Sequence, residues 1–531
     1  MVSNLAGLSI KDDHLRRALV GEDYLVIDGA MGTQMQERGL DGAEPVPELL
    51  CKTHADDIAA IHASYVAAGA EVVTTNTFSA NRLKLGDHMS VEEAYRLAAE
   101  CARRAGAPYI AGDIGPTGSL LQPMGTLSFD EAYDIFAEQV RAAASAGCDL
   151  ILIETMADLR EAKAALLAAR ENSTLPVFVT MTFGEDGRTF LGTPPEVAAE
   201  VLSSLGAQAV GLNCSLGPTE LLGAAQAMAH RVRCPLIVQP NAGLPRMEEG
   251  RTLFDVTAED FADAMSAMLD AGASIVGGCC GTSPRYIKLL ADKLAAREAP
   301  TPRDFKPACV LTSAQEAVVL GKGAHAVAVV GERINPTGKK KLKAALRAGD
   351  LDYLVGEAVT QKNAGADVLD VNVGLPEIDE PAMLAAAVEK LSATVTLPLV
   401  IDSSDPVAIE RVVRGYAGKP LINSVNGKRE SLDAVLPIAK KYGCAVIGLA
   451  LDEEGIPPTA EGRFKVAERI VAEAERVGIP REDVVIDCLV MAAATNQREG
   501  MEILRAVSMV KERLGVRTVL GVSNISFGIP Q

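Results

Sequence analysis

The 531-residue sequence lacks any run of about 18 uninterrupted apolar residues, so no membrane-spanning helix is expected. Its N-terminus, MVSNLAGLSIKDDHLRR, lacks the basic-then-apolar pattern of a secretory signal peptide. Positive charge is also in deficit, because 51 Lys and Arg against 70 Asp and Glu give a formal charge of −19. This sign argues against a nucleic-acid partner, which needs a basic face, and against an anionic membrane surface.

Cysteine is scarce as well. Ten cysteines in so long a chain are too few for a disulfide scaffold, and no CxxC pair occurs. They fit a reducing cytoplasm, where a few thiols react or bind metal. Apolar residues make up 48% of the sequence, enough for a sizeable core, so wholesale disorder is excluded.

Short apolar strands alternate with Ala-rich helical segments through the first half of the chain. Most of the predicted strands are continuous apolar runs, typical of parallel strands covered by helices. They span 24–28, 71–75, 109–113, 149–154, 176–182, 208–213, 235–239 and 273–278. A glycine flanked by small residues, as in Ala146-Gly147-Cys148, precedes several strands and can end a helix in the left-handed conformation. Eight such units predict a (β/α)8 barrel over residues 1–296.

A stretch rich in Pro and charge begins at residue 297, and we predict a linker over 297–322. The alternation of predicted strands and helices begins again in the second region, 323–531. Its predicted strands span 326–331, 367–373, 398–402, 420–424, 444–449, 484–488 and 518–523. The predicted fold class is therefore α/β, with two tandem (β/α)8 TIM-type barrels, the second lacking its last βα unit. Because a seven-stranded remnant keeps two open edges, we expect the chain to be a fragment of a longer protein.

Three cysteines follow strand ends at one rim of the first predicted barrel. Cys214 follows the sixth strand in GLNCSLGP, and Cys279 and Cys280 follow the eighth in VGGCCGTSP. Chemistry in such barrels occurs at the carboxyl ends of the strands, so three thiolates can converge there on one soft cation. Three protein ligands with an open fourth position are typical of a catalytic zinc site, which can hold a substrate thiol as its thiolate.

Two other interpretations of this rim stay open from the residues alone. The cysteines can be small buried residues in tight glycine-rich turns, since free cysteine is often simply buried. Alternatively, Gly277, Gly278 and Gly281 can form a phosphate cradle after the eighth strand.

Five motifs in order resemble the homocysteine methyltransferase family. They are DGAMGT at 28–33, TNTF at 75–78, IETM at 153–156, GLNC at 211–214 and GGCCGT at 277–282. The resemblance covers about residues 15–300. It implies a zinc-bound homocysteine thiolate as methyl acceptor, with Cys214, Cys279 and Cys280 as the metal ligands.

The same resemblance implies which residues hold the amino-acid end of homocysteine. Asp28 and Glu154 are expected to bind the ammonium group, which needs an anionic partner. The other predicted contacts are the backbone amides of Ala30 and Met31 and the side chains of Asn76 and Thr77. For Asp28, a helix-capping or turn role in DGAMG is the alternative.

Acidic and amide side chains occupy successive strand ends of the second predicted barrel. They are Glu332, Asn335, Asp370, Asn372, Asp402, Asn423, Asn426, Asp487 and Asn524. His and Lys are nearly absent there, which argues against phosphate binding and histidine acid–base chemistry. A flat heterocycle suits this ring, since a carboxylate can accept two parallel N–H bonds. A Mg²⁺ site, or helix caps such as Ser403, stay open as alternatives.

Four motifs in this region resemble the pterin-binding methyltransferase family. They are GERINPTG at 331–338, DVLDVNVG at 367–374, IDSS at 401–404 and INSVNG at 422–427. The region departs from the related dihydropteroate synthases, because no SFxDGG sequence follows its first asparagine.

That resemblance covers about residues 325–531 and implies methyltetrahydrofolate as ligand. The resemblance implies that the pterin edge is recognised by Asp402, Asn423 and Asp487. It also implies that Asn524 is the catalytic residue, which supports protonation of N5. The other residues implied to line the pocket are Glu332, Asn335, Asp370 and Asn372.

The order of the two barrels resembles the N-terminal half of the cobalamin-dependent methionine synthase family. This implies ping-pong methyl transfer, first from methyltetrahydrofolate to cobalamin and then to homocysteine. No DxHxxG motif of the cobalt-ligating type occurs, so cobalamin is expected on another domain or a separate corrinoid protein. Two alternatives remain: a corrinoid-dependent methyltransferase with another methyl donor, and a non-catalytic binding fragment.

Overall fold

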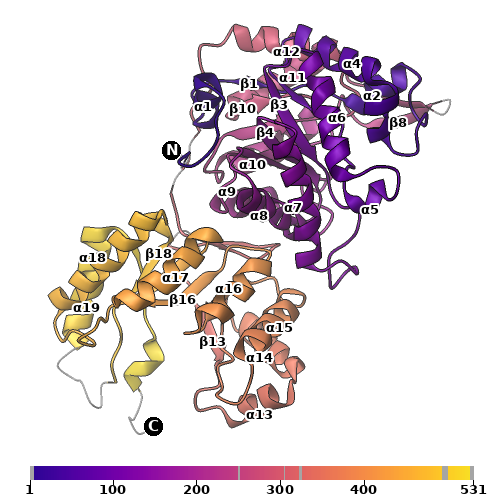
Figure 1. Ribbon diagram of the computed structural model, residues 1–531. Helices are drawn as coiled ribbons and strands as arrows, with labels where there is room; N and C mark the ends of the chain where they lie inside the picture. Colours follow the sequence, from indigo (N-terminus) through magenta and orange to yellow (C-terminus); the bar gives the residue numbers. More distant parts are fainter. Residues whose placement is uncertain are drawn as a thin grey trace. The chain divides into compact units, whose positions relative to one another are not determined.

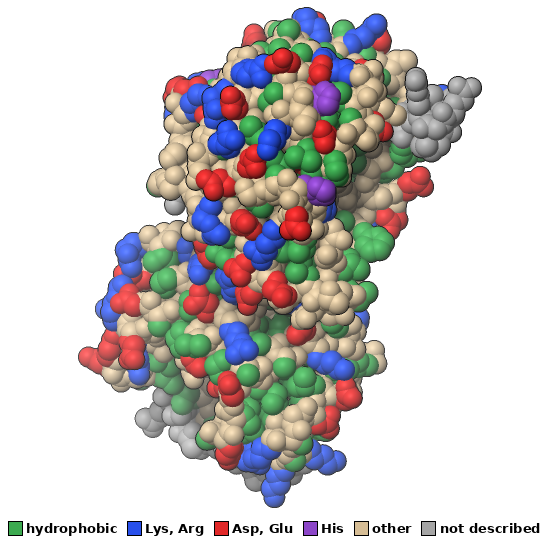
Figure 2. Space-filling model, turned by 45° about the vertical axis from the view of Figure 1, so that its right-hand side comes forward, with side chains coloured by type: hydrophobic (Ala, Val, Ile, Leu, Met, Phe, Trp, Pro, Cys, Tyr) green, Lys and Arg blue, Asp and Glu red, His purple; other side chains and the backbone are tan. Residues whose placement is uncertain are grey.

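The computed structural model describes residues 5–248, 251–303, 305, 307–321, 326–492 and 500–526. The chain divides into two compact units, Met1–Lys306 and Pro307–Gln531. Within the described ranges, no helix is long and apolar enough to cross a membrane. On the face drawn in Figure 2, acidic and basic side chains are interspersed.

Eight parallel strands form the barrel of the first unit, in the order β1-β10-β7-β6-β5-β4-β3-β2. They are β1 (Leu25–Val26), β2 (Val72–Thr74), β3 (Tyr109–Ile114), β4 (Leu150–Met156), β5 (Val177–Met181), β6 (Ala209–Asn213), β7 (Leu236–Gln239) and β10 (Ala273–Val276). A parallel bridge between Ile27 and Val72 joins β1 to β2 and closes the sheet. An antiparallel hairpin, β8 (Pro245–Glu248) and β9 (Arg251–Phe254), is inserted before β10.

Helices connect these strands and cover them from outside, as Figure 1 shows for α6, α7 and α8. The helices of the first unit are α1 (Asp13–Leu19), α2 (Met31–Glu37), α3 (Leu50–Thr53), α4 (Ala55–Ala67), α5 (Arg82–Leu85), α6 (Val91–Arg104), α7 (Phe129–Ser145), α8 (Leu159–Asn172), α9 (Pro195–Ser204), α10 (Pro218–Ala229), α11 (Ala258–Asp270) and α12 (Pro284–Ala295). Helix α7 begins with a capping box, in which Ser128 and Glu131 satisfy each other's backbone amides. It ends before Gly147, whose φ of 76° turns the chain into β4.

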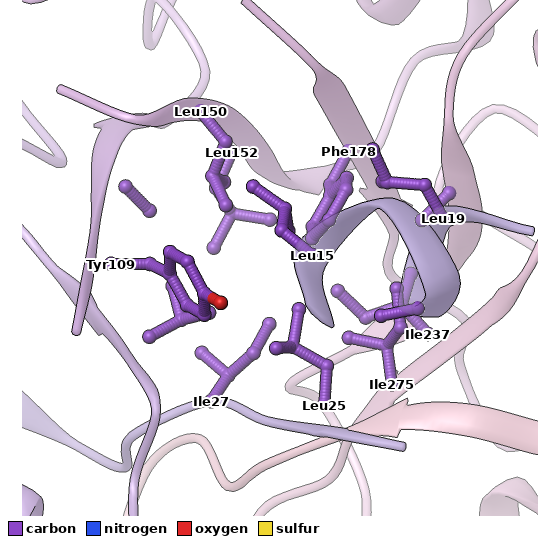
Figure 3. Packing of buried hydrophobic residues seen from close by; sticks show 14 residues of the cluster. Leu15, Leu19, Leu25, Ile27, Tyr109, Leu150, Leu152, Phe178, Ile237 and Ile275 are labelled. Carbon is purple, nitrogen blue, oxygen red and sulfur yellow. The ribbon is translucent and has the colours of Figure 1, made fainter. Parts of the chain in front are cut away.

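Helix α1 closes the N-terminal end of this barrel. Leu15 and Leu19 are fully buried in the core cluster shown in Figure 3. Around them lie side chains from the starts of the strands: Leu25, Tyr109, Leu150, Phe178, Ile237 and Ile275. Asp12 caps α1 and accepts a hydrogen bond from the Tyr109 hydroxyl at 2.8 Å. Because this end is sealed, the opposite rim is left for ligands.

Seven parallel strands form the sheet of the second unit, in chain order. They are β13 (Val330–Ile334), β14 (Val368–Val371), β15 (Leu399–Asp402), β16 (Leu421–Asn426), β17 (Ala445–Leu449), β18 (Val484–Asp487) and β19 (Arg517–Val519). In the part of the chain that the structure describes, no pairing joins β13 to β19. The predicted fold class is thus confirmed, including the incomplete second barrel. The first predicted strand, 326–331, is displaced toward the C-terminus, because β13 runs from Val330 to Ile334 and pairs with β14 there. The last, 518–523, is shorter than predicted, because β19 ends at Val519 and pairs only with β18.

The helices of the second unit cover the sheet in the same way. They are α13 (Lys340–Ala348), α14 (Leu351–Asn363), α15 (Glu380–Ser392), α16 (Pro406–Gly415), α17 (Arg429–Lys441), α18 (Ala460–Val477) and α19 (Gly500–Met509). A hairpin, β11 (Val310–Thr312) and β12 (Ala317–Val319), lies inside the segment predicted as a linker. Its Leu311 and Val318 are buried against residues that begin strands, such as Val368 and Leu421. The hairpin therefore seals this sheet as α1 seals the first barrel.

Candidate functional site

Three cysteine side chains meet at the carboxyl ends of β6 and β10. The Sγ atoms of Cys214, Cys279 and Cys280 all lie within 4.8 Å of one another, and those of Cys214 and Cys280 are 3.9 Å apart. Cys214 has a φ of 60°, an uncommon conformation for a residue with a side chain and one that clusters at functional sites. The structure thus brings together all three cysteines singled out by the sequence.

The three thiols do not ionise independently. The pKa of Cys214 falls to about 3 because the thiols of Cys279 and Cys280 donate hydrogen bonds to its thiolate. The pKa of Cys280 rises to about 12, and that of Cys279 rises well above its usual value, mainly through their hydrogen bonding with Cys214. A divalent cation resolves this competition, because all three sulfurs can then be thiolates. Three soft ligands with an open fourth position fit zinc.

The glycines around Cys279 and Cys280 are required by close packing. A Cβ on Gly277 would lie 2.9 Å from the Asp28 carbonyl oxygen, and one on Gly278 would lie 2.5 Å from the Thr282 hydroxyl. The Thr282 hydroxyl donates to the Cys279 carbonyl at 2.7 Å and accepts from the Ala30 amide at 3.2 Å. The turn after β10 is therefore tied to the turn after β1.

Asn213, the last residue of β6, connects the cysteines to a carboxyl group. Its Oδ1 accepts from the Thr155 amide at 2.9 Å and from the Thr180 hydroxyl at 2.8 Å. Its Nδ2 donates to Glu154 Oε2 at 3.2 Å and lies 3.9 Å from Cys279 Sγ. Asn213 thus holds Glu154 beside the cysteines. Sequence reasoning missed this role, although Asn213 stands in the GLNC motif.

A cavity of about 440 Å³ lies against the cysteine cluster at this rim. Four carboxyl side chains line it: Asp28, Glu48, Asp113 and Glu154. No Lys, Arg or His is among the described residues that line it. The Asp28 carboxylate accepts from the Thr74 amide at 2.9 Å and the Thr74 hydroxyl at 3.2 Å. The cavity therefore offers acceptors for a cationic group and no side-chain cation.

Burial raises the pKa of each of these carboxyl groups. It raises the pKa of Asp28 to about 7, and that of Glu154, with help from the charges of Cys214 and Asp28, to about 8. The pKa of Asp113 rises well above its usual value, and that of Glu48 is also raised. A bound cation lowers such pKa values, so the cavity suits a small molecule with an ammonium group.

Some of the other residues predicted for the first barrel line the cavity, and others hold the backbone beside it. Ala30, Met31 and Asn76 line the cavity, and the Asn76 side chain donates to the Pro47 carbonyl at 2.8 Å. Met31 begins α2, whereas the Ala30 amide already donates to Thr282. Thr77 is fully buried outside the lining and donates to the Asp113 carbonyl at 2.8 Å. Thr77 therefore supports the end of β3.

Part of the polar ring predicted in the second unit gathers at the ends of β14, β15 and β16. The Asn423 side chain donates to Asp370 Oδ1 at 3.3 Å. Burial and the neighbouring Asp402 carboxylate raise the pKa of Asp370 well above its usual value. Burial also raises the pKa of Asp402, although a hydrogen bond from Asn372 opposes this shift. Burial therefore favours the neutral form of both carboxyl groups, and N–H donors of a ligand would favour the carboxylate form.

Three further predicted residues lie on or after strands β13 and β18 of the same sheet. Glu332 on β13 accepts from the Asn335 side chain at 3.4 Å. Asp487 ends β18 and accepts from the Leu489 amide at 2.7 Å, and burial raises its pKa.

Asn524, predicted as the catalytic residue, is exposed in the short 3-10 helix Val522–Ser526 that follows β19. Its backbone amide donates to the Gly521 carbonyl at 3.0 Å. Among the described residues, no hydrogen bond joins its side chain to the rest of the ring.

Arg463 of α18 supports the second site and was not found from the sequence. It is fully buried, and its guanidinium donates to the carbonyls of Cys488 and Leu489 at 2.7 and 2.9 Å. It also donates to the Pro457 carbonyl at 2.9 Å. Arg463 thereby fixes the turn directly after Asp487. No local motif signals this role, which is visible only in three dimensions.

Comparison with known proteins agrees with this division of the chain. Residues 25–294 match the family model "Homocysteine S-methyltransferase", and residues 331–530 match "Pterin binding enzyme". Two curated proteins are each 32% identical to this chain: the methionine synthases of Mycobacterium tuberculosis (strain ATCC 25618 / H37Rv) and Mycobacterium leprae (strain TN). Each alignment covers 96% of this chain and 45% of the relative, so the chain spans less than half of their length.

A solved structure is similar to part of the chain. The homocysteine methyltransferase MmuM from Escherichia coli, in its oxidised form, is 24% identical, with a TM-score of 0.46. The match covers 53% of this chain and 100% of that one.

Proposed function

Because the chain belongs to the homocysteine S-methyltransferase family, we propose that it methylates homocysteine to methionine. The methyl group would come from 5-methyltetrahydrofolate by way of a cobalamin carrier. The observation that carries the proposal is the convergence of three cysteine sulfurs within 4.8 Å beside a cavity lined by four carboxyl groups. A thiol with an ammonium group matches both features at once.

The first unit would bind homocysteine at two points. Cys214, Cys279 and Cys280 would hold zinc, which when bound lowers the pKa of the substrate thiol and orients its sulfur. Asp28 and Glu154 would hold the ammonium group, whose charge offsets the burial that raises their pKa. The ordering of Glu154 by Asn213 keeps this second anchor beside the first.

The second unit would bind the pterin of methyltetrahydrofolate. Carboxyl groups such as Asp402 and Asp487 can each accept N–H bonds from the edge of the ring, and Asn423 adds an amide. The remaining predicted contacts are Glu332, Asn335, Asp370 and Asn372. Asn524 would support protonation of N5, which makes the departing nitrogen neutral and so a better leaving group.

Cobalamin would be carried by another domain or a separate corrinoid protein. The lack of a DxHxxG motif supports this assignment, as does the greater length of the curated relatives. A cytoplasmic location belongs to the same proposal, because a reducing compartment keeps the three thiols available for metal.

The test is metal content in cysteine variants. We expect protein purified without chelator to hold about one zinc per chain, as a three-cysteine site requires. Cys280→Ala should lose it, whereas Cys148→Ala, which changes a buried cysteine outside the cluster, should keep it. A metal-free wild type that takes up no zinc even with homocysteine would overturn the proposal.

A further inference from the structure

Asp113 is a carboxyl group of the cavity that the proposed function leaves without a role. It lies on β3, lines the cavity and is only 4% exposed. Its Oδ1 is buried without a hydrogen-bond partner in the part of the chain that the structure describes. Asp28 and Glu154, in contrast, already accept from Thr74 and Asn213. An unpaired buried carboxyl oxygen is costly unless a ligand or a proton satisfies it.

The barrel places Asp113 between the two carboxyl groups assigned to the ammonium. Strands β1, β2, β3 and β4 are successive neighbours, closed by the bridge between β1 and β2. Asp28 follows β1, Asp113 lies near the end of β3, and Glu154 lies near the end of β4. After burial, the charges of Glu154 and then Asp28 contribute most to raising the pKa of Asp113. The three groups therefore act on one region of the cavity.

The backbone of Asp113 is held by hydrogen bonds, while Oδ1 of its side chain has no partner among the described residues. Its carbonyl accepts from the Thr77 hydroxyl at 2.8 Å and the Tyr95 hydroxyl at 2.7 Å. Its amide donates to the Thr75 hydroxyl at 3.0 Å. A group fixed by such a shell, with free hydrogen-bonding capacity toward a cavity, is preorganised for a ligand.

We propose that Asp113 is the third acceptor for the substrate ammonium group, alongside Asp28 and Glu154. An alkylammonium group has three N–H donors, and carboxyl groups from three strand ends accept one each. Glu48 Oε2 is likewise buried without a hydrogen-bond partner among the described residues, but Glu48 is left out of this set because the Lys84 cation already acts on its charge. This inference rests on the proposed function and states which end of homocysteine Asp113 recognises.

The arrangement makes the site selective for a free amine. A thiol without an ammonium group would leave three buried carboxyl groups with no cation. Sites built to bond a polar group reject ligands that lack it, because their own groups stay unpaired.

The experiment measures binding of three thiols to the zinc-loaded chain by calorimetry. Homocysteine carries both charged groups, 3-mercaptopropylamine lacks the carboxylate, and 4-mercaptobutyrate lacks the amine. We expect Asp113→Asn to weaken homocysteine and 3-mercaptopropylamine roughly 10- to 100-fold, the effect of losing a charged hydrogen bond. Affinity for 4-mercaptobutyrate should not change. Asp130→Asn, in the first turn of α7, is the matched control and should bind all three like the wild type.

Each other pattern overturns the inference. Equal weakening of all three thiols would mean a structural role, and selective weakening of 4-mercaptobutyrate would mean that Asp113 contacts the carboxylate. Unchanged binding of homocysteine would remove Asp113 from the site. If Asp113→Asn fails to fold or to hold zinc, Asp113→Glu replaces it, because this variant keeps the charge and should still prefer thiols that carry an amine. Loss of that preference in Asp113→Glu would contradict the inference. A wild type that binds none of the thiols would overturn the proposed function as well.

Discussion

Asp28, which is proposed to bind the substrate ammonium group, lowers the stability of the empty folded protein because it is buried. Its pKa is about 7 in the folded protein, against an ordinary value of 3.8. Between these two values the folded protein binds more protons at this site than the unfolded chain does, so stability falls as the pH rises. Above about pH 7 the whole penalty is present.

Asp28→Asn should therefore stabilise the empty protein, and more so at pH 8 than at pH 5. A shift of this size corresponds to at most about 4 kcal/mol at pH 8. Urea denaturation at the two pH values measures the free energy of unfolding. An equal gain at both, or a loss that grows with pH, would contradict the role of burial.

Asp402 tests the second site at the scale of one residue. Asp402→Ala should weaken binding of methyltetrahydrofolate by several-fold or more, because buried N–H groups of the pterin lose their acceptor. Titration followed by ligand fluorescence measures this, with Asp352→Ala as the control at a carboxyl group that is 84% exposed. Unchanged affinity in Asp402→Ala would remove it from the site.

The position of a residue in the site could be predicted where a local motif and its place at a strand end were sufficient. The adjacent Cys279 and Cys280, with Cys214 two strands earlier in the chain, required only the rule that barrel chemistry lies at carboxyl ends. Asn213 and Asp113 could not be predicted in the same way. Their roles depend on Glu154 and on hydroxyl groups from other strands, which a linear sequence does not place beside them.

At the scale of elements, both sheets are sealed at the N-terminal end by a segment outside the strand–helix repeat. Helix α1 does this in the first unit and the β11–β12 hairpin in the second. The strands themselves could be predicted, because fully buried parallel strands leave continuous apolar runs. The hairpin could not, since its strands of three residues are too short for a periodic signal.

Leu15→Ala tests the seal of the first barrel. Leu15 is fully buried, so this change should lower the free energy of unfolding by roughly 2–5 kcal/mol. Leu83→Ala, at a leucine that is 51% exposed, should change it by less than about 0.5 kcal/mol. Urea denaturation compares the two variants. A loss in Leu15→Ala no larger than that of the control would contradict the packing of α1 in the core.

At the scale of the whole molecule, the proposed function assigns one chemical task to each of the two compact units. The boundary between them, at Lys306 and Pro307, separates the residues proposed for homocysteine from those proposed for folate. The net charge of −19 identified neither ligand. A net charge does not show that several carboxyl groups lie buried in clusters. Burial raises the pKa values of these groups, and a cationic or N–H-rich ligand is then favoured.

The proposal predicts that each half of the methyl transfer can be lost separately. With free methylcobalamin supplied for one half-reaction and chemically reduced cob(I)alamin for the other, Cys214→Ser should lose transfer from methylcobalamin to homocysteine but keep demethylation of methyltetrahydrofolate. Asp402→Ala should show the opposite pattern. Loss of both half-reactions in either variant would contradict the assignment of one task to each unit.

The most direct measurement is the rate at which the zinc-loaded wild-type chain demethylates methylcobalamin with homocysteine, followed by cobalamin absorbance and methionine formation. The account predicts homocysteine-dependent turnover that Cys214→Ser abolishes and Cys148→Ala retains. A wild type that holds zinc but forms no methionine, or a Cys214→Ser variant that forms it at the wild-type rate, would contradict it.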